Sequence, residues 1–129
     1  RYGWPIMDCY EVALSEEPRA RPPAHARPNE PVYSAVAVQG DELVGFVNAV
    51  LHRSTWSVDN FCYLEDLYVA PTIRGGGTGK LLIEWVQHFA RQQQCARLYW
   101  HTHNTNKRAQ KLYNWVAENS GFIEYRMAL

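Results

Sequence analysis

The stretch Arg74–Lys80 has the sequence RGGGTGK and joins an expected strand to an expected helix. Glycines allow the backbone to turn sharply and to approach a ligand closely. The first N–H groups of a helix have no partner inside it, and the helix dipole adds partial positive charge there. This arrangement suits an anion such as a pyrophosphate, and Arg74 and Lys80 would add positive charge.

Three kinds of phosphate-binding loop compete for this stretch. A Walker A loop requires glycine where Arg74 stands and Ser or Thr where Leu81 stands, so it fails twice. The dinucleotide pattern GxGxxG fails because Lys80 occupies its last glycine position. The pattern R-x-x-G-x-G is satisfied by Arg74, Gly77 and Gly79. A plain glycine-rich turn without a ligand is the structural alternative.

On the N-terminal side of the loop, apolar and β-branched runs predict three strands. These strands span Val32–Val38, Leu43–Ser57 and Phe61–Val69, and Pro71 ends the third. The residues of Gln39–Glu42 are typical of a turn, so the first two strands are expected to form a hairpin.

On the C-terminal side, helical spacing of apolar residues predicts a helix over Gly79–Gln94 and another over Asn106–Asn119. Strands are expected over Arg97–His103 and Phe122–Leu129, and Gly121 is expected to stop the second helix. Antiparallel strands come first and alternating elements follow. The sequence therefore predicts an α/β (α+β) fold with a mixed, mostly antiparallel central sheet flanked by helices.

The length of 129 residues suits a single domain over residues 1–129. Its N-terminal part, 1–31, is expected to hold a short helix from about Met7 to Ser15. The segment Pro18–Pro31 follows with five of the seven prolines and predicts a mobile connector. Residues 32–129 are expected to form the core.

Composition narrows the classes of partner. The formal net charge is zero, with 13 basic and 13 acidic residues, which argues against a nucleic-acid or membrane partner held by bulk electrostatics. We expect no membrane span and no secretory leader. Cys9, Cys62 and Cys95 lack the spacing of a metal site and are expected to be free thiols, which favours a cytoplasmic location.

The loop is one of three motifs that together resemble the GNAT superfamily of N-acetyltransferases. Asn106–Tyr113, NKRAQKLY, fits that family's N-x-x-A-x-x-L-Y helix, and Gly121-Phe122 fits the G-F that follows it. The resemblance covers 32–129 and implies a GNAT fold with two parallel strands splayed apart at the cofactor. It implies transfer of an acetyl group from acetyl-CoA to a primary amine in a ternary complex.

Two segments resemble particular branches of the superfamily. Tyr63–Val69, YLEDLYV, is similar to the spermidine/spermine acetyltransferases, and Leu98–Thr102, LYWHT, to the yeast Hpa-type histone, polyamine and D-amino-acid acetyltransferases. Both imply a cationic amine acceptor: a polyamine, an amino acid or a protein lysine. Against the family pattern the first strand is apparently missing, and no strand follows Phe122–Leu129. We expect a trimmed chain or a homodimer joined through sheet edges.

The resemblance also implies which residues contact acetyl-CoA, and it requires no metal. Backbone of the third strand would pair with the pantetheine arm like an added strand, and the glycine loop would hold the pyrophosphate. The implied cofactor-binding residues are Leu67, Tyr68, Val69, Arg74, Gly75, Gly76, Gly77, Thr78, Gly79, Lys80, Asn106 and Ala109.

The catalytic residues that the resemblance implies are Tyr113 and Glu65. Tyr113 would protonate the departing thiolate, since a phenol with a pKa of about 10 can donate to sulfur as charge develops; the alternative is a core tyrosine. Glu65 would deprotonate the ammonium through water, and Asp66 would help to bind the cationic substrate or would form a structural ion pair. Adjacent strand residues point to opposite faces unless a bulge intervenes.

Two further residues are candidates for the acceptor site. His101 shares a strand face with His103, so the two could supply an alternative base or metal ligands, or be hydrogen-bonded histidines at a strand end. Trp56 offers an aromatic face that suits an ammonium, although core or interface packing is its commoner use.

The sequence therefore predicts an acetyl-CoA-dependent N-acetyltransferase acting on a small amine or a lysine-bearing peptide. A non-catalytic module that binds or senses acyl-CoA is the alternative. A nucleotide-binding protein that uses the glycine loop is the third interpretation.

Overall fold

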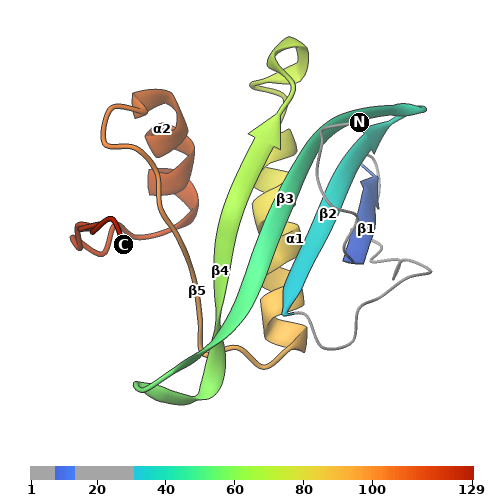
Figure 1. Cartoon of the computed structure of the whole chain (residues 1–129). Helices are drawn as coiled ribbons and strands as arrows, with labels where there is room; N and C mark the ends of the chain where they lie inside the picture. The colour runs from blue at the N-terminus through green and yellow to red at the C-terminus, as the bar shows by residue number, and fades with distance from the viewer. Residues whose placement is uncertain (1–7, 14–30) are drawn as a thin grey trace.

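A mixed five-stranded sheet organises the computed structural model, which describes residues 8–13 and 31–129 (Figure 1). The elements are β1 (Asp8–Ala13), β2 (Val32–Gln39), β3 (Glu42–Ser54), β4 (Ser57–Val69), the 3-10 turn η1 (Pro71–Ile73), α1 (Thr78–Gln92), β5 (Arg97–Trp100) and α2 (Lys107–Val116). The strands lie side by side in chain order, β1 to β5. The two central pairs are antiparallel and the two outer pairs are parallel, which confirms the mixed sheet.

Two antiparallel hairpins form the middle of the sheet. The β2–β3 connection turns at Gly40 and Asp41, where Gly40 adopts a left-handed φ of 60°. The expected turn is therefore confirmed. The β3–β4 hairpin has longer strands. At its tip, Ser54 of β3 pairs with Ser57 of β4.

The core lies between the sheet and α1, which crosses behind the strands in Figure 1. Leu82, Trp85 and Val86 of α1 are almost fully buried, as the helical spacing of its apolar residues predicts. They pack against the sheet residues that point the same way, among them Val47 of β3 and Cys62 of β4. We call this side of the sheet the helix face and the other side the open face.

The cysteine thiols that the structure describes are free, as expected. Cys62 lies in the core, and burial, with a smaller effect of the nearby Cys95, raises the pKa of its thiol to about 12. A buried thiol of this kind packs as a small apolar side chain.

Near the N-terminus the prediction of a helix from Met7 to Ser15 is wrong over residues 8–13. These residues form β1, which pairs in parallel with β2, so a strand does precede Val32 and the first strand is not missing. The physical reason is tertiary: the edge of β2 supplies backbone hydrogen-bond partners that outweigh a weak local preference. The rest of that helix and the connector before residue 31 lie outside the described residues.

Near the C-terminus the elements are shorter than predicted. β5 ends at Trp100 instead of His103, and α2 ends at Val116 because Ala117 is extended, with φ −149° and ψ 177°. The strand predicted over Phe122–Leu129 is wrong, since those residues are exposed and have no strand structure. Alternation of apolar residues gives a segment one apolar face, but a strand forms only where another strand offers an edge to pair with.

Gly45 marks the closest approach between two neighbouring strands. A Cβ atom at this position would lie 2.7 Å from the backbone oxygen of Tyr68 and 3.3 Å from Leu82 of α1. Only glycine fits this contact, so Gly45 fixes how tightly β4 and α1 pack against β3.

We predict that Gly45→Ala lowers the free energy of unfolding by about 1–3 kcal/mol, because the added methyl group must displace backbone. Chemical denaturation monitored by tryptophan fluorescence measures the change. The exposed substitution Asp41→Ala in the neighbouring turn is the control and should change stability little. Equal stability of Gly45→Ala and wild type would contradict the prediction.

Candidate functional site

The parallel strands β4 and β5 pair over only part of their length. Their register runs from Phe61↔Arg97 to Leu64↔Trp100, whereas β4 continues to Val69. Beyond Leu64, no residue of β5 pairs with β4 in the described chain, and Figure 1 shows the two segments diverging toward α2. The predicted splay of two parallel strands is therefore present.

The glycine loop stands at the end of β4 and leads directly into α1. Gly75 and Gly77 both have a φ of 87°, a left-handed conformation that suits glycine. Gly77 is the N-cap of α1 and makes no side-chain capping bond, and the first helical bond runs from Leu81 N–H to its carbonyl. Gly75 to Gly77 are exposed, so the loop is open to solvent. Helix amides left without a side-chain cap at an exposed turn are the geometry of an anion site.

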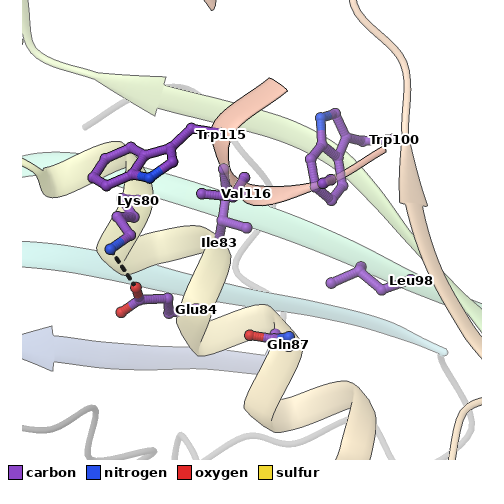
Figure 2. Close-up of a pocket in the computed structure, with 9 residues that line it drawn as sticks. Lys80, Ile83, Glu84, Gln87, Leu98, Trp100, Trp115 and Val116 are labelled. Atoms are coloured by element: carbon purple, nitrogen blue, oxygen red, sulfur yellow. Dashed lines mark ion pairs between the residues drawn. The ribbon is translucent and has the colours of Figure 1, made fainter. Parts of the chain in front are cut away.

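The positively charged side chains of Arg74 and Lys80 point in different directions. Arg74 stays at the loop, where its Nε donates to the carbonyl of Val69 at 3.1 Å. Lys80 instead points along α1, with its Nζ 3.4 Å from Glu84 and 4.3 Å from the centre of a Trp115 ring (Figure 2). The structure therefore holds the guanidinium of Arg74 at the end of β4 and directs the ammonium of Lys80 toward Glu84 and Trp115.

Helix α2 packs against the first turn of α1. A Cβ atom at Gly79 would lie 3.2 Å from Leu112, so glycine lets the two helices approach. Asn106 caps α2, because its Oδ1 accepts from the backbone N–H of Ala109 at 3.2 Å. The motif residues of α2 thus position this helix beside the glycine loop.

Tyr113 follows Leu112 on α2 and is half-buried. Its ring lies 5.5 Å from the ring of Trp100 in an edge-to-face arrangement. Burial raises the pKa of its phenol, so the hydroxyl keeps its proton throughout the neutral range. The arrangement gives a protonated phenol on the helix that packs on the loop.

A cavity of about 420 Å³ lies between α1, β5 and α2 (Figure 2). Leu98 and Trp100 line it from β5, while Lys80 and Glu84 line it from α1 and Trp115 from α2. The cavity lies along α1 beyond the loop, so it is a neighbour of the candidate anion site and not the site itself.

A bulge in β4 sets the direction of the two carboxylates. Asp66 pairs with Asn48 and Leu64 pairs with the next residue of β3, Ala49, which leaves Glu65 as an extra residue. Leu64 and Leu67 both pack on the helix face, so the two residues between them lie on the open face. The expectation that Glu65 and Asp66 point to opposite faces is thereby corrected, and both are exposed.

Histidine and tyrosine side chains extend this acidic pair across the open face. The hydroxyl of Tyr63 lies 3.2 Å from Nδ1 of His101, which lies 3.4 Å from Glu124. Burial, followed by the charges of Glu65 and Glu124, raises the pKa of Tyr63. His101 is thus hydrogen-bonded to Tyr63, whose strand also carries the acidic pair.

The remaining candidates lie apart from this group. Trp56 is at the tip of the β3–β4 hairpin and is 88% exposed, at the opposite end of β4 from the glycine loop. At about 3.3 Å per residue, the strand separates it from the loop by about 40 Å. His103 bonds to Thr105 after β5. Within the described residues, no three His, Cys, Asp or Glu side chains are grouped to hold a metal, and no helix has the length and apolar character for a membrane crossing.

Sequence reasoning missed Asn48 and Ser34, which the structure places beside Asp66. Ser34 and Asn48 are hydrogen-bonded to each other, and Asn48 is bonded to the carboxylate of Asp66. One signal was available, because Asn48 is a polar residue inside the apolar run from Val44 to Leu51. The bulge that brings both carboxylates to the open face leaves no mark in the sequence.

Comparisons with known proteins agree with this geometry. The chain is similar to a D-amino-acid N-acetyltransferase of Saccharomyces cerevisiae, with 35% identity over 85 residues, 66% of this chain and 53% of that protein. It is similar to a thialysine N-epsilon-acetyltransferase of Mus musculus, with 33% identity over 93 residues, 68% of this chain and 54% of that protein. The chain therefore spans about half the length of these relatives.

Solved structures share the fold. An integron cassette protein from the mobile metagenome of V. cholerae has a TM-score of 0.70 at 26% identity, covering 80% of this chain and 64% of that one. An aminoglycoside N-acetyltransferase in complex with CoA has a TM-score of 0.67 at 24% identity, covering 78% of each chain. The model of the acetyltransferase (GNAT) family matches residues 4–115, nearly the whole sequence. With the splayed strands and the open glycine loop, this match shows that the chain belongs to the acetyltransferase (GNAT) family.

Proposed function

We propose that this chain is an acetyl-CoA-dependent N-acetyltransferase for small, positively charged primary amines. The observation that supports it most directly is the exposed glycine turn, Gly75 to Gly77, at the N-terminus of α1, where the helix of Tyr113 also packs. The named substrates of the two relatives, a D-amino acid and thialysine, suggest amino compounds as acceptors. A cytoplasmic location, expected from the free thiols, belongs to the same proposal.

The residues at the end of β4 fit coenzyme A. Amides from Gly75 to Lys80, of which Gly75 to Gly77 belong to exposed residues, would bind the pyrophosphate, with Arg74 beside them in the chain. Backbone of Leu67–Val69, beyond the last β5 pair, would bind the pantetheine arm as a strand binds a strand. Asn106, which caps α2 by accepting from the N–H of Ala109, would contact the cofactor arm. The bound cofactor would supply an acetyl group activated as a thioester.

Tyr113 is assigned as the general acid. Its phenol remains protonated at neutral pH because burial raises its pKa, so it has a proton to donate to the departing sulfur. As the new C–N bond forms and the C–S bond breaks, the phenol proton passes to the departing sulfur, so that coenzyme A leaves as its thiol.

Glu65 and Asp66 are assigned to the acceptor amine. An amine attacks only when neutral, and Glu65 would take its proton, through water, on the open face. Asp66 lies on the same face and would hold the ammonium or a second positive charge of the acceptor. His101, which is hydrogen-bonded to Tyr63, would be an alternative base for the acceptor amine. Trp56 is left out of the acceptor site because of its distant position.

Turnover with a panel of amines tests this function. The panel contains thialysine, a D-amino acid, spermidine, an aminoglycoside and a lysine-bearing peptide, and release of the CoA thiol is the readout. We expect faster release with the first two than with the peptide. Binding of coenzyme A without release for any amine would favour the non-catalytic acyl-CoA module instead.

We predict that Gly77→Ala weakens binding of coenzyme A about tenfold, because an L side chain at a φ of 87° strains the turn that presents the helix amides. Isothermal titration calorimetry measures the affinity. Gly40→Ala is the matched control, since Gly40 also has a left-handed φ, 60°, but lies in the β2–β3 turn. Equal weakening by both substitutions would show that the effect is not specific to the loop.

We predict that Tyr113→Phe lowers kcat by about 100-fold at neutral pH, since the ring stays in place but loses the proton donor. The KM for acetyl-CoA should change little. Thiol release under saturating substrates measures kcat, and Tyr125→Phe, at an exposed tyrosine, is the control. Full turnover by Tyr113→Phe would remove Tyr113 from the mechanism.

We predict a homodimer joined through sheet edges. The outer edge of β5 pairs with no other strand in the described sheet, and Phe122, Ile123 and Tyr125 expose apolar surface after α2. Exposed edges and apolar segments favour the addition of a strand from another chain. Light scattering at micromolar concentration should give twice the mass of the chain, and the mass of a monomer would contradict this prediction.

A further inference from the structure

A row of three hydrogen-bonded polar side chains crosses the open face from β2 to β4. The Ser34 hydroxyl donates to Oδ1 of Asn48 at 2.6 Å. Nδ2 of Asn48 donates to Oδ2 of Asp66 at 2.9 Å. Ser34 pairs directly with Asn48, and Asn48 directly with Asp66, so the backbone register of three strands holds the row together.

The hydrogen bonds of the row are all donated in one direction, from Ser34 toward Asp66. An ionised carboxylate only accepts hydrogen bonds, so the NH₂ group of Asn48 must face Asp66. The carbonyl of Asn48 then faces Ser34, whose hydroxyl has to donate. Each bond polarises the next, and the series ends on the carboxylate of Asp66. Asp66 thus determines which way the amide of Asn48 is turned, and Ser34 supports that orientation by donating to the amide oxygen.

Packing does not explain the row. The neighbouring rows of the open face are apolar and aromatic: Val36, Phe46 and Tyr68 on one side, and Val32, Val50 and Tyr63 on the other. Ser34 is buried, and polar groups in such surroundings cost free energy unless they are hydrogen-bonded. An aliphatic side chain at position 48 would continue the apolar face without that cost. The polar row is therefore better explained by its exposed end, Asp66, than by the core.

We infer that Asn48, supported by a hydrogen bond from Ser34, is a positioning residue that holds the carboxylate of Asp66 for the amine acceptor. The amide of Asn48 donates to Oδ2 of Asp66, and this bond restricts the rotation of an exposed carboxylate. An exposed aspartate without this bond would rotate among several orientations. The inference rests on the proposed function, because it requires that Asp66 meets the amine.

Kinetics of Asn48 variants test the inference, with thialysine or the D-amino acid as acceptor, whichever the wild type acetylates faster. Asn48→Leu keeps the number and branching of the side-chain heavy atoms, but it removes both hydrogen bonds. We expect its KM for the amine to rise about tenfold, as for loss of a hydrogen bond to a charged group. kcat and the KM for acetyl-CoA should stay within about twofold of wild type.

Asn48→Ala should show the same rise in KM, and Ser34→Ala a smaller one, because Ser34 acts only through Asn48. Val50→Ala is the matched control, since Val50 lies on the same face in the next row and does not contact Asp66. Thermal unfolding of every variant identifies any loss of fold. A merely structural role predicts that Asn48→Leu keeps the wild-type KM, and that result would overturn the inference.

A double-mutant cycle with Asp66→Asn completes the test. If Asn48 acts through Asp66, then adding Asn48→Leu to Asp66→Asn should leave the KM for the amine unchanged. Additive effects of the two substitutions would show that Asn48 acts elsewhere and would overturn the inference. Failure of the proposed function looks different, because the wild type itself would then acetylate no amine and both proposals would fall.

Discussion

Strand β4 pairs with β3 as far as Val69 but with β5 only as far as Leu64. The bulge at Glu65 begins at the residue after that last pair. A bulge bends and twists its strand, so it turns the end of β4 away from β5. The same local irregularity therefore opens the space between the two strands and brings two adjacent carboxylates to one face. The bulge at Glu65 therefore shapes both the proposed cofactor site and the proposed acceptor site.

Two glycines fix the distance at which the helices meet this strand end. Gly45 allows β4 and α1 to pack closely on β3, and Gly79 allows Leu112 of α2 to rest on the first turn of α1. The glycine loop is thus held between close contacts at its two flanks, although the loop itself is exposed. A rigid frame around an open turn presents amides to a ligand in a fixed direction, which is what anion recognition requires.

How much the sequence predicts depends on the range of the interaction involved. The spacing of Leu82, Trp85 and Phe89 predicts α1, because helical periodicity is a local property. The helix expected over residues 8–13 and the strand expected over Phe122–Leu129 are wrong, because pairing with a distant edge decides whether a strand forms. The position of Trp56 follows from where a long hairpin ends. A bulge decides to which face of the sheet Asp66 points. Neither the position of Trp56 nor the face of Asp66 can be derived from neighbouring residues alone.

The two carboxylates of the bulge share a face but not an environment. Asp66 accepts a hydrogen bond from Asn48, whereas Glu65 has no side-chain hydrogen bond with any described residue. A carboxylate held by a fixed donor is suited to binding a positive charge in one place. A carboxylate that can turn is suited to collecting a proton, directly or through water. Since adjacent like charges favour different roles when their surroundings differ, the donor from β3 is what separates binding at Asp66 from proton transfer at Glu65.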